Sequence, residues 1–462
     1  MTANLFIRRT LLACALLQAG AAAAEGALDA SWGFAGTGKS PIAFDFGSTK
    51  ADIASASVIG SDGAMYISGT VFDAGGVSRM GVTRLLPNGL IDTNFGTDGR
   101  AMTQGSQGEL FNTAGIVMRG NSLLVGGYKK KTADNWDFVL CAFSTGGVPL
   151  LFNSTLTSCV SASFDPGPSL SRDIPRAMAV QADGKIVMAG TTAVNTVTDT
   201  YAAFARFNTD GALDHTFGLS NSGIQLARSS NFLRHQINAV AIASNGKIVG
   251  VGKTDVVGGN DSSAVIVRLD TDGTVEQLSQ SNECTFEVDG SNSRDTELLG
   301  LTMVPNGGGL EDDFVAVGYA QMSGTVHSGL IAKRRGAACA YDSSFSGGDG
   351  TSGYTVVTAG DSMTFESVAT QPNVGYVIAA TYTSTGGDAD WLVGRYRPDG
   401  SSDSLLTPID FGVVHQTDIV ADVHVFHDGI YVAGSWQKTG ANYDFGAARL
   451  SLDQIFADGF NH

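Results

Sequence analysis

Short hydrophobic runs separated by glycine-containing turns recur along the chain. In the clearest case, residues 174–192 (IPRAMAVQADGKIVMAGTT), an apolar run leads to an Asp-Gly turn and then to a second run rich in β-branched side chains. Asp and Gly tolerate the backbone of a tight turn, and two such runs on either side are typical of a β-hairpin. No segment has the length and amphipathic periodicity of a clear helix, so the pattern predicts an all-β protein.

The hairpin belongs to a unit that repeats about every 60 residues. A glycine turn ends each unit, and a second glycine turn marks the hairpin about 26 residues earlier. A third run leads to the unit-ending turn and a Leu-Asp-x-x-Phe motif follows it, so each unit is expected to contain four strands. The unit-ending turns are at Gly89, Gly147, Gly211, Gly273, Gly336, Gly400 and Gly459, and the hairpin turns are at Gly63, Gly120, Gly184, Gly246, Gly307, Gly375 and Gly429.

Seven units of four antiparallel strands predict a seven-bladed β-propeller, in which twisted sheets pack face to face around a central axis. The Leu-Asp-x-x-Phe-like motif begins at Leu28 and again at Leu452, so we expect the two ends of the chain to meet in one blade. Such closure removes the exposed edge that an open solenoid, the alternative, would leave. Small residues that should let neighbouring sheets approach closely recur at Gly69, Gly126, Gly127, Gly190, Gly252, Gly318 and Gly434.

Residues 1–24 have the form of a secretory signal peptide. Two arginines precede an alanine-rich apolar stretch, which ends in small side chains suited to cleavage before Glu25. The stretch is shorter than the roughly 20 residues of a bilayer span, which disfavours a retained membrane anchor. A lipoprotein cleaved at Cys14 would have a still shorter apolar region. We therefore expect a secreted or periplasmic protein in which residues 25–462 form a single domain.

Charge and cysteine content narrow the partners and the compartment. The formal net charge of −17 repels phosphate backbones and anionic lipids, so nucleic acid and membrane surfaces are disfavoured. Four cysteines follow the signal peptide, and an even number in an oxidising compartment favours disulfides over a zinc site. Three connectivities are open. We favour Cys141 with Cys159 and Cys284 with Cys339, because sequence neighbours in a repeat protein are usually neighbours in space.

The repeat resembles one that is already known. Each unit has the form LDxxFG, then a hairpin like ALAxxxDGKIVVAG, then an ARxxxDG turn, most clearly in the units ending at Gly89, Gly211, Gly273 and Gly400. In these motifs the chain is similar to the delta-60 repeat family of bacterial exported β-propellers. The resemblance covers nearly all of residues 25–462. It implies a propeller at the cell surface or in the periplasm, and it implies no catalytic residues.

Polar residues that recur from unit to unit favour structural roles. The recurring arginines are expected to form inter-blade ion pairs or hydrogen bonds, and the Leu-Asp-x-x-Phe aspartates are expected to accept backbone N–H groups in turns. The arginines are Arg84, Arg206, Arg268, Arg395 and Arg449, and the aspartates are Asp29, Asp92, Asp214, Asp342, Asp403 and Asp453.

Few candidate ligands stand outside the repeat. The acidic segment GGDAD contains Asp388 and Asp390, which are the candidates for calcium because Ca²⁺ prefers oxygen ligands, although no EF-hand-like loop is present. His415, His424 and His427 are close in sequence. A spacing of three on a strand, however, points the last two rings to opposite faces.

Two functions fit these observations. We favour a non-enzymatic scaffold that binds a protein, peptide or glycan partner through loops at one end of the blades. The alternative is a propeller-type hydrolase or lyase acting on a sugar or lactone, with calcium as a candidate cofactor. An enzyme would need a non-repeated cluster of acids, bases or metal ligands facing the channel. The sequence shows only repeated polar positions, so we expect a monomeric binding protein without catalytic residues.

Overall fold

Strands make up nearly all the regular structure of the chain, in agreement with the all-β prediction. The structure is a computed structural model of the 462-residue chain. Its only helical elements among the described residues are the short 3-10 turns η1 (Phe34–Gly36) and η2 (Leu219–Asn221). No helix in the described part is long and apolar enough to cross a membrane. The structure describes residues 27–44, 50–105, 109–132, 135–164, 171–194, 199–228, 232–256, 261–276, 283–288, 295–306, 311–323, 326–336, 340–346, 353–358, 361–412, 416–440 and 442–452.

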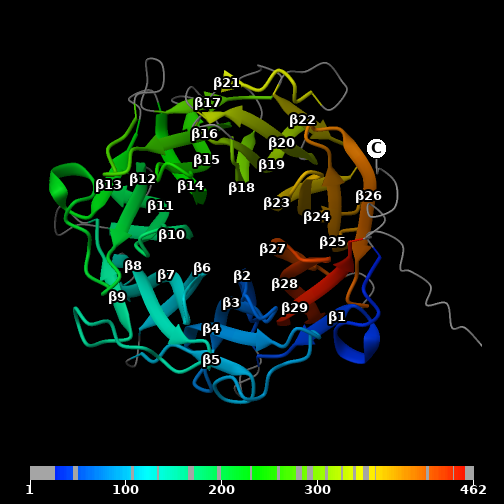
Figure 1. The fold of residues 1–462 in the computed structure, drawn as a ribbon, viewed down its shortest axis with the longest axis horizontal. Coiled ribbons are helices and arrows are strands. Elements are labelled where there is room, and N and C mark those ends of the chain that lie inside the picture. The colour runs from blue at the N-terminus through cyan, green and yellow to red at the C-terminus, as the bar shows by residue number, and fades with distance from the viewer. Residues whose placement is uncertain are drawn as a thin grey trace, which may run out of the picture.

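The strands are grouped into antiparallel blades that stand around a central axis, each with its first strand innermost (Figure 1). The first two blades contain β2 (Ile53–Ile59), β3 (Met65–Phe72), β4 (Ser78–Leu85) and β5 (Arg100–Met102), then β6 (Leu110–Arg119), β7 (Ser122–Thr132), β8 (Asn135–Ser144) and β9 (Cys159–Ala162). The next two contain β10 (Ser171–Val180), β11 (Ile186–Val194), β12 (Thr200–Phe207) and β13 (Ile224–Ala227), then β14 (Phe232–Ile242), β15 (Ile248–Val256), β16 (Ser262–Leu269) and β17 (Cys284–Phe286).

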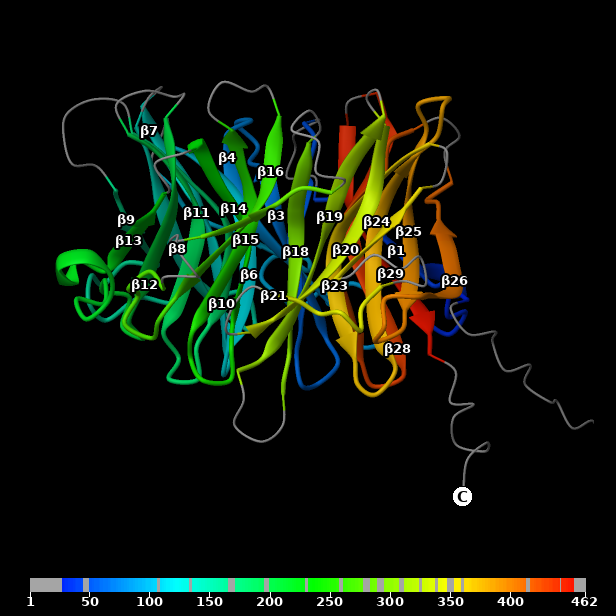
Figure 2. The same cartoon turned by 90° about the horizontal axis from the view of Figure 1, so that it is seen from above.

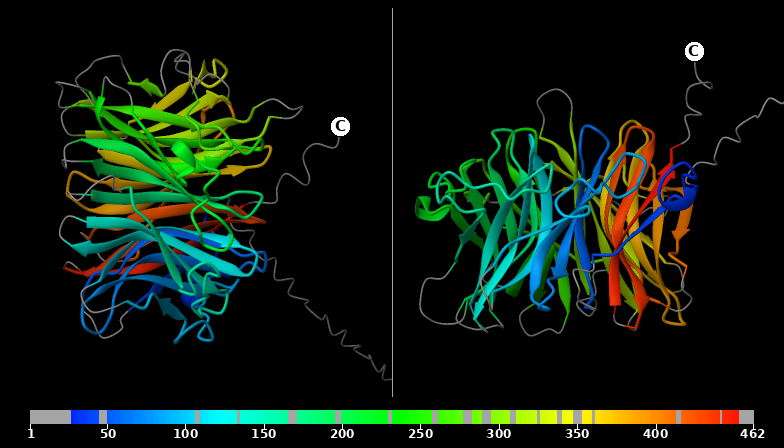
Figure 3. Two further views of the ribbon diagram at one scale, coloured as in Figure 1. Left: turned by 90° about the vertical axis from the view of Figure 1, so that its left-hand side faces the viewer. Right: turned by 90° about the horizontal axis from the view of Figure 1, so that it is seen from below.

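The remaining blades complete the ring. They contain β18 (Thr296–Val304), β19 (Asp313–Ser323), β20 (Val326–Arg335), β21 (Ala340–Tyr341) and β22 (Tyr354–Val357), then β23 (Ser362–Gln371), β24 (Gly375–Thr383), β25 (Ala389–Tyr396) and β26 (Ser402–Ile409), and finally β27 (Ile419–Phe426), β28 (Gly429–Thr439), β29 (Asn442–Ser451) and β1 (Lys39–Ile42). Short parallel pairings of β8 with β10 and of β12 with β14 join three blades into one twelve-stranded sheet. Side views show the strands of the blades running between two faces of the ring (Figures 2 and 3). The arrangement is a β-propeller.

The two ends of the chain meet in the last blade, as the duplicated motif predicts. Strand β1 pairs with β29 from Lys39 opposite Ala448 to Ile42 opposite Phe445. The Asp29 carboxylate forms an ion pair with Arg449, close to a bridge between Leu28 and Leu450. The N-terminal segment thus supplies the outermost strand of this blade, and strands from both ends of the described chain close the ring.

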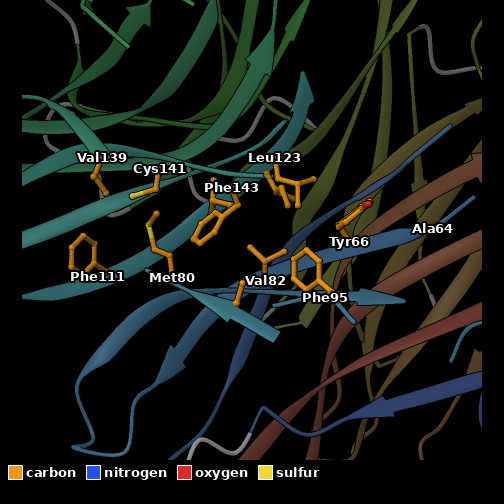
Figure 4. Close-up of a cluster of buried hydrophobic side chains, with 13 residues drawn as sticks. Ala64, Tyr66, Met80, Val82, Phe95, Phe111, Leu123, Val139, Cys141 and Phe143 are labelled. Atoms are coloured by element: carbon orange, nitrogen blue, oxygen red, sulfur yellow. The ribbon is translucent and has the colours of Figure 1, made fainter. Parts of the chain in front are cut away.

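Apolar clusters fill the spaces between adjacent blades. Figure 4 shows one of them, in which Met80 and Val82 of the β2–β5 blade meet Phe111 and Val139 of the β6–β9 blade. All four side chains are at most 2% exposed. Burying one such side chain stabilises a fold by roughly 1.5–3 kcal/mol, so these interfaces hold the ring together.

A disulfide joins the two outer strands of the β6–β9 blade. Cys141 on β8 and Cys159 on β9 are bonded, which confirms this predicted pair. Cys284 on β17 is also disulfide-bonded. Its predicted partner Cys339 lies outside the described residues, so that pairing stays a prediction.

Four of the recurring arginines, Arg84, Arg206, Arg395 and Arg449, pair with Leu-Asp-x-x-Phe aspartates of their own blades, whereas Arg268 pairs with Glu276 and Glu311. Arg206 Nε lies 2.7 Å from Asp214 Oδ2, while Asp214 Oδ1 accepts the backbone N–H of Thr216 at 3.1 Å. The predicted turn role of this aspartate is therefore confirmed. Arg206 also donates to the carbonyl of Thr271 in the next blade at 2.5 Å, so it fixes both its own blade and the neighbouring one.

Candidate functional site

The innermost strand of every blade contains a β-bulge. In each pairing of an innermost strand with the next strand, the register skips one residue at an equivalent level. A bulge leaves one residue without a cross-strand partner and re-aims its side chain. The skipped residues, called bulge residues below, are Ser55, Ala114, Arg176, Asn238, Leu299, Glu366 and Ala421.

The bulges explain most of the small residues that recur in the second strands. A Cβ on Gly190 would lie 2.1 Å from the Ile174 carbonyl oxygen, and a Cβ on Gly252 would lie 1.9 Å from that of Gln236. Both carbonyls precede the bulge of the paired strand, and no side chain can occupy that space. Gly126 instead allows the close approach of neighbouring sheets that the sequence predicts. A Cβ added at this position would lie 2.9 Å from Met178 Sδ of the next blade.

All the bulge residues line one cavity of about 650 Å³, bounded by the innermost strands around the axis. Its apolar wall includes Met118, Met178 and Leu301, and its hydroxyl groups include Ser57. A cavity of this size with a few polar groups on an apolar wall suits a small-molecule ligand. The repeat therefore fixes the position of these side chains but not their chemistry.

Two bulge residues carry charge-bearing groups without a protein partner. Within the described chain, neither Arg176 nor Glu366 forms a hydrogen bond or an ion pair, although Arg176 is exposed to solvent. Enclosure by the blades lowers the pKa of Arg176, and the nearby Glu297 opposes this effect. A guanidinium stays protonated at any physiological pH. Burial, aided by the charge of Glu297, raises the pKa of Glu366 to about 8, so this carboxyl is largely protonated near neutral pH.

A polar cluster from three blades lies on the wall of the same cavity. Asp422 and His424, two residues apart on β27, share one face of the strand. Asp422 Oδ2 accepts the Ser57 backbone N–H at 3.0 Å and lies 3.2 Å from His424 Nε2, while Asp422 Oδ1 accepts the Ser367 hydroxyl at 2.9 Å. Ser57 Oγ lies 2.9 Å from the same His424 nitrogen. The cluster joins β27 to β2 and β23.

The cluster has the residue types of a nucleophilic triad but not its connections. In a triad the base uses one ring nitrogen for the serine and the other for the aspartate. Here Nε2 of His424 contacts both Ser57 and Asp422. Burial lowers the pKa of His424, but Asp422 and the Ser57 carbonyl outweigh this effect and raise it overall. Because the Ser57 hydroxyl and the Asp422 carboxylate share one ring nitrogen, His424 is not placed between them as the general base of a triad.

A second network holds Glu297 close to the cavity. Its Oε1 accepts the Asn238 amide at 2.9 Å, and its Oε2 lies 2.8 Å from both Lys253 Nζ and the Tyr319 hydroxyl. Burial and the charge of Glu297 raise the pKa of Tyr319, which keeps this hydroxyl a donor. The network holds the Glu297 carboxylate in place, and it binds the side chain of Asn238, a bulge residue on the cavity wall.

Three carboxylates form a separate group between the last two blades. One oxygen each of Asp390, Asp410 and Asp418 lies within 4.8 Å of the others, and oxygens in such a group are ligands that Ca²⁺ takes. Burial, with the charges of Asp388 and Asp410, raises the pKa of Asp390, and burial raises that of Asp418 to about 6. The structure thus groups the predicted ligand Asp390 with Asp410 and Asp418 rather than with Asp388. Calcium binding there stays a prediction.

Equivalent aspartates in two other blades carry their own cation. Asp137 and Asp444 each form an ion pair with a lysine six residues earlier in the sequence. Ser384 occupies that place before Asp390. Among the described residues no lysine or arginine pairs with the three-carboxylate group. Lys39 donates a hydrogen bond to the backbone carbonyl of Asp410 and not to its carboxylate. Burial therefore raises the pKa values of Asp390 and Asp418 without a neighbouring cation to oppose it.

The sequence carries a signal for the cavity in the spacing of the bulge residues. Arg176 stands eight residues before its hairpin glycine, and Ser55, Asn238, Leu299 and Ala421 have the same spacing. Aligning the units on this position would have shown that its charge varies. Of the predicted histidines, His424 faces the cavity, His427 lies in a turn with φ of 51°, and His415 lies outside the described residues.

A family model supports the propeller fold. The model described as "Domain of unknown function (DUF5122) beta-propeller" matches residues 60–95, 181–217 and 243–277. These segments run from the hairpin turn to the Leu-Asp-x-x-Phe motif, or the place of that motif, in three blades. No curated protein matches the chain.

Solved structures are similar to this chain at low identity. A protein of unknown function from Dyadobacter fermentans is 12% identical, with 90% of this chain and 98% of that chain covered and a TM-score of 0.42. A periplasmic gluconolactonase from Pseudomonas aeruginosa is 10% identical, with coverages of 84% and 97% and a TM-score of 0.46. An α-L-arabinofuranosidase from Fusarium graminearum is 9% identical, with coverages of 90% and 98% and a TM-score of 0.43. None of these likenesses assigns a function to this chain.

Proposed function

We propose that this protein is an exported, seven-bladed β-propeller of the delta-60 type that binds a small carboxylate-bearing molecule in its central cavity without catalysing a reaction. The count of seven treats the twelve-stranded sheet as three blades. Export rests on the predicted signal peptide, residues 1–24, which lies outside the described residues. The disulfide between Cys141 and Cys159 is consistent with an extracellular or periplasmic location.

The observation that carries the proposal is Arg176, a guanidinium that lines the central cavity and has no hydrogen-bond or ion-pair partner among the described residues. Arginine presents donors in a planar fork that matches a carboxylate, and such charge-assisted pairs are stronger than neutral hydrogen bonds. The other charged groups near the wall are bonded within the protein, Glu297 to Lys253 and Asp422 to His424. With Glu366 largely protonated, no ionised bulge residue is present to pair with Arg176 across the cavity. Anionic ligands are therefore favoured over cationic ones.

The walls favour an aliphatic ligand such as a peptide end over a bare inorganic anion. Met118, Met178 and Leu301 offer apolar and thioether surface in the same cavity as the guanidinium. Contact with this surface adds the hydrophobic contribution that inorganic anions cannot supply. A peptide carboxylate with its aliphatic side chains satisfies both requirements, which is compatible with the peptide partner favoured by the sequence.

The alternative function is a hydrolase or lyase with Glu366 as the general acid. Its raised pKa is the property that such a group needs. A general acid also needs a base or nucleophile within reach of the same substrate. In the described structure, the carboxylate of Glu297 is held by three neighbours and His424 is tied to Asp422, so binding is the better-supported function.

Calorimetric titration with hexanoate tests the binding proposal. We expect hexanoate to bind wild-type protein, while hexanamide and hexylamine, which match it in length but lack the negative charge, bind at least about tenfold more weakly. Arg176→Gln should abolish hexanoate binding. Arg234→Gln is the matched control, because Arg234 is an exposed arginine paired with Asp255 away from the cavity lining. Equal affinities for hexanoate and hexanamide, or full binding by Arg176→Gln, would exclude the proposal.

A further inference from the structure

The bulge residues differ in charge although the bulges themselves are equivalent. Five of them are neutral, whereas the third along the chain is Arg176 and the sixth is Glu366. The strands that carry these two, β10 and β23, lie on opposite sides of the centre of the ring (Figure 1). Both side chains line the same cavity. A ligand long enough to cross the cavity therefore meets Arg176 at one end and Glu366 at the other.

Neither group is satisfied by the protein. Within the described residues Arg176 and Glu366 form no ion pair with each other and no hydrogen bond to another group, and both line the cavity, Arg176 exposed and Glu366 half-buried. Their donor and acceptor groups are therefore available to a ligand in the cavity. Aliphatic and thioether side chains, including Ile116, Met178 and Val240, line the cavity along with them. A ligand that suits the cavity is thus polar at both ends and apolar between them.

We propose that Arg176 and Glu366 bind opposite ends of one aliphatic ligand, which carries a carboxylate at one end and a hydrogen-bond-accepting carboxylate or carbonyl at the other. The proposal rests on the carboxylate binding proposed above and specifies its ligand class. Arg176 forms the ion pair, and the protonated Glu366 donates its O–H to the far end. A carboxyl kept neutral by an apolar site is an effective donor to an anionic oxygen. The simplest ligands of this class are straight-chain dicarboxylates.

The surroundings of Glu366 account for its proton. Burial disfavours the charged carboxylate, and Glu297 on the neighbouring β18 adds repulsion. Ionisation above about pH 8 would remove the donor and place a negative charge opposite the second carboxylate of the ligand. Affinity for a dicarboxylate should therefore fall at high pH. The titratable side chains on the elements packed against β23 include Glu297 on β18, Tyr319 on β19, His327 on β20, Tyr376 and Tyr382 on β24, and Asp422 and His424 on β27.

Calorimetry with dicarboxylates from succinate to sebacate, and with the monocarboxylate of each length, tests the proposal on the full chain. At about pH 6.5 we expect the best dicarboxylate to bind at least about tenfold more tightly than its monocarboxylate. Glu366→Ala should reduce this preference to near unity, while Glu366→Gln, whose amide still donates, should retain most of it. Glu109→Gln, at a surface ion pair with Lys129, is the matched control and should behave as wild type.

A pH series provides the second readout. Between about pH 6.5 and about pH 9.5, the wild-type affinity for the dicarboxylate should fall about tenfold or more, and that of Glu366→Gln should not. Equal affinity for dicarboxylates and monocarboxylates, or the same pH response in Glu366→Gln, would overturn this proposal alone. Failure of every carboxylate to bind would overturn it together with the proposed function. Thermal midpoints of the variants confirm that each is folded.

Discussion

Replacing Glu366 with glutamine should stabilise the protein, and the gain should grow with pH. In the folded state burial raises the pKa of this carboxyl from its ordinary 4.5 to about 8. Between these values the folded protein binds a proton that the unfolded chain releases, so wild-type stability falls as pH rises. Glutamine keeps a similar shape and cannot ionise. The variant should therefore match wild type near pH 4.5 and exceed it above.

The magnitude follows from the size of the pKa change. At about 1.36 kcal/mol per pH unit, the wild-type penalty reaches ~3 kcal/mol at neutral pH. Water in the open cavity screens the carboxyl and reduces this to about 1.5–2 kcal/mol. Urea denaturation followed by tryptophan fluorescence, at a series of pH values, measures the difference. The pKa of Asp418 is also raised, but this group titrates equally in both proteins, so its contribution cancels in the stability difference between them. A difference that stays flat from pH 4.5 to pH 8 would refute the reasoning, and Glu109→Gln should show no such trend.

Three further predictions concern the scaffold. Asp418→Asn removes a buried carboxyl whose pKa is about 6 instead of the ordinary 3.8. It should therefore raise the unfolding free energy by up to about 3 kcal/mol above pH 6 and change it little below pH 4. Thermal midpoints measured at the two pH values would show this difference. Cys141→Ser with Cys159→Ser opens a loop of 18 residues and should lower the unfolding free energy by about 3 kcal/mol, and a reducing agent, which also reaches the disulfide of Cys284 in both proteins, should lower that of wild type by about 3 kcal/mol more than that of the double variant. Gly252→Ala places a Cβ 1.9 Å from a backbone carbonyl and should destabilise by at least about 2 kcal/mol in urea, whereas Gly146→Ala, with its nearest atom at 3.6 Å, should be close to neutral.

The fold could be predicted from the sequence because its determinants are local. Gly184 adopts a φ of 82° in the hairpin turn where the Asp-Gly signal places it, and the strands on both sides pair as expected. Ring closure followed from one duplicated motif, and the structure adds that β1 (Lys39–Ile42) comes from the N-terminal side. The pairing of Cys141 with Cys159 followed from neighbouring strands of one blade. Each of these inferences needed only a repeat, a turn or a short separation in sequence.

The cavity could not be predicted in the same way because alternation does not reveal it. An innermost strand presents its edge to the axis, while its side chains alternate toward the two neighbouring blades. The alternation of side chains along the strand therefore distinguishes the two blade interfaces, but it does not show which residues line the channel. Only the bulge turns a residue such as Arg176 out of the ladder, and a bulge depends on pairing that no single run of residues shows. Asp422, and its grouping with the candidate His424, were missed for a related reason, since their shared partner Ser57 is more than 360 residues away.

The bulge and the glycine that faces it link the repeat to the proposed function. The glycine of the second strand leaves room for the carbonyl that precedes the bulge, as Gly190 does for Ile174. With the backbone fixed in this way, the bulge residue contributes little to pairing, so its identity is limited mainly by the cavity that it lines. In the blade that carries Glu366, Ala380 stands opposite the bulge in place of glycine, so this blade departs from the repeat at both positions. A ring of equivalent backbone positions with variable side chains can thus acquire new ligand chemistry one blade at a time. The pair of Arg176 and Glu366 is the form that this chemistry takes here.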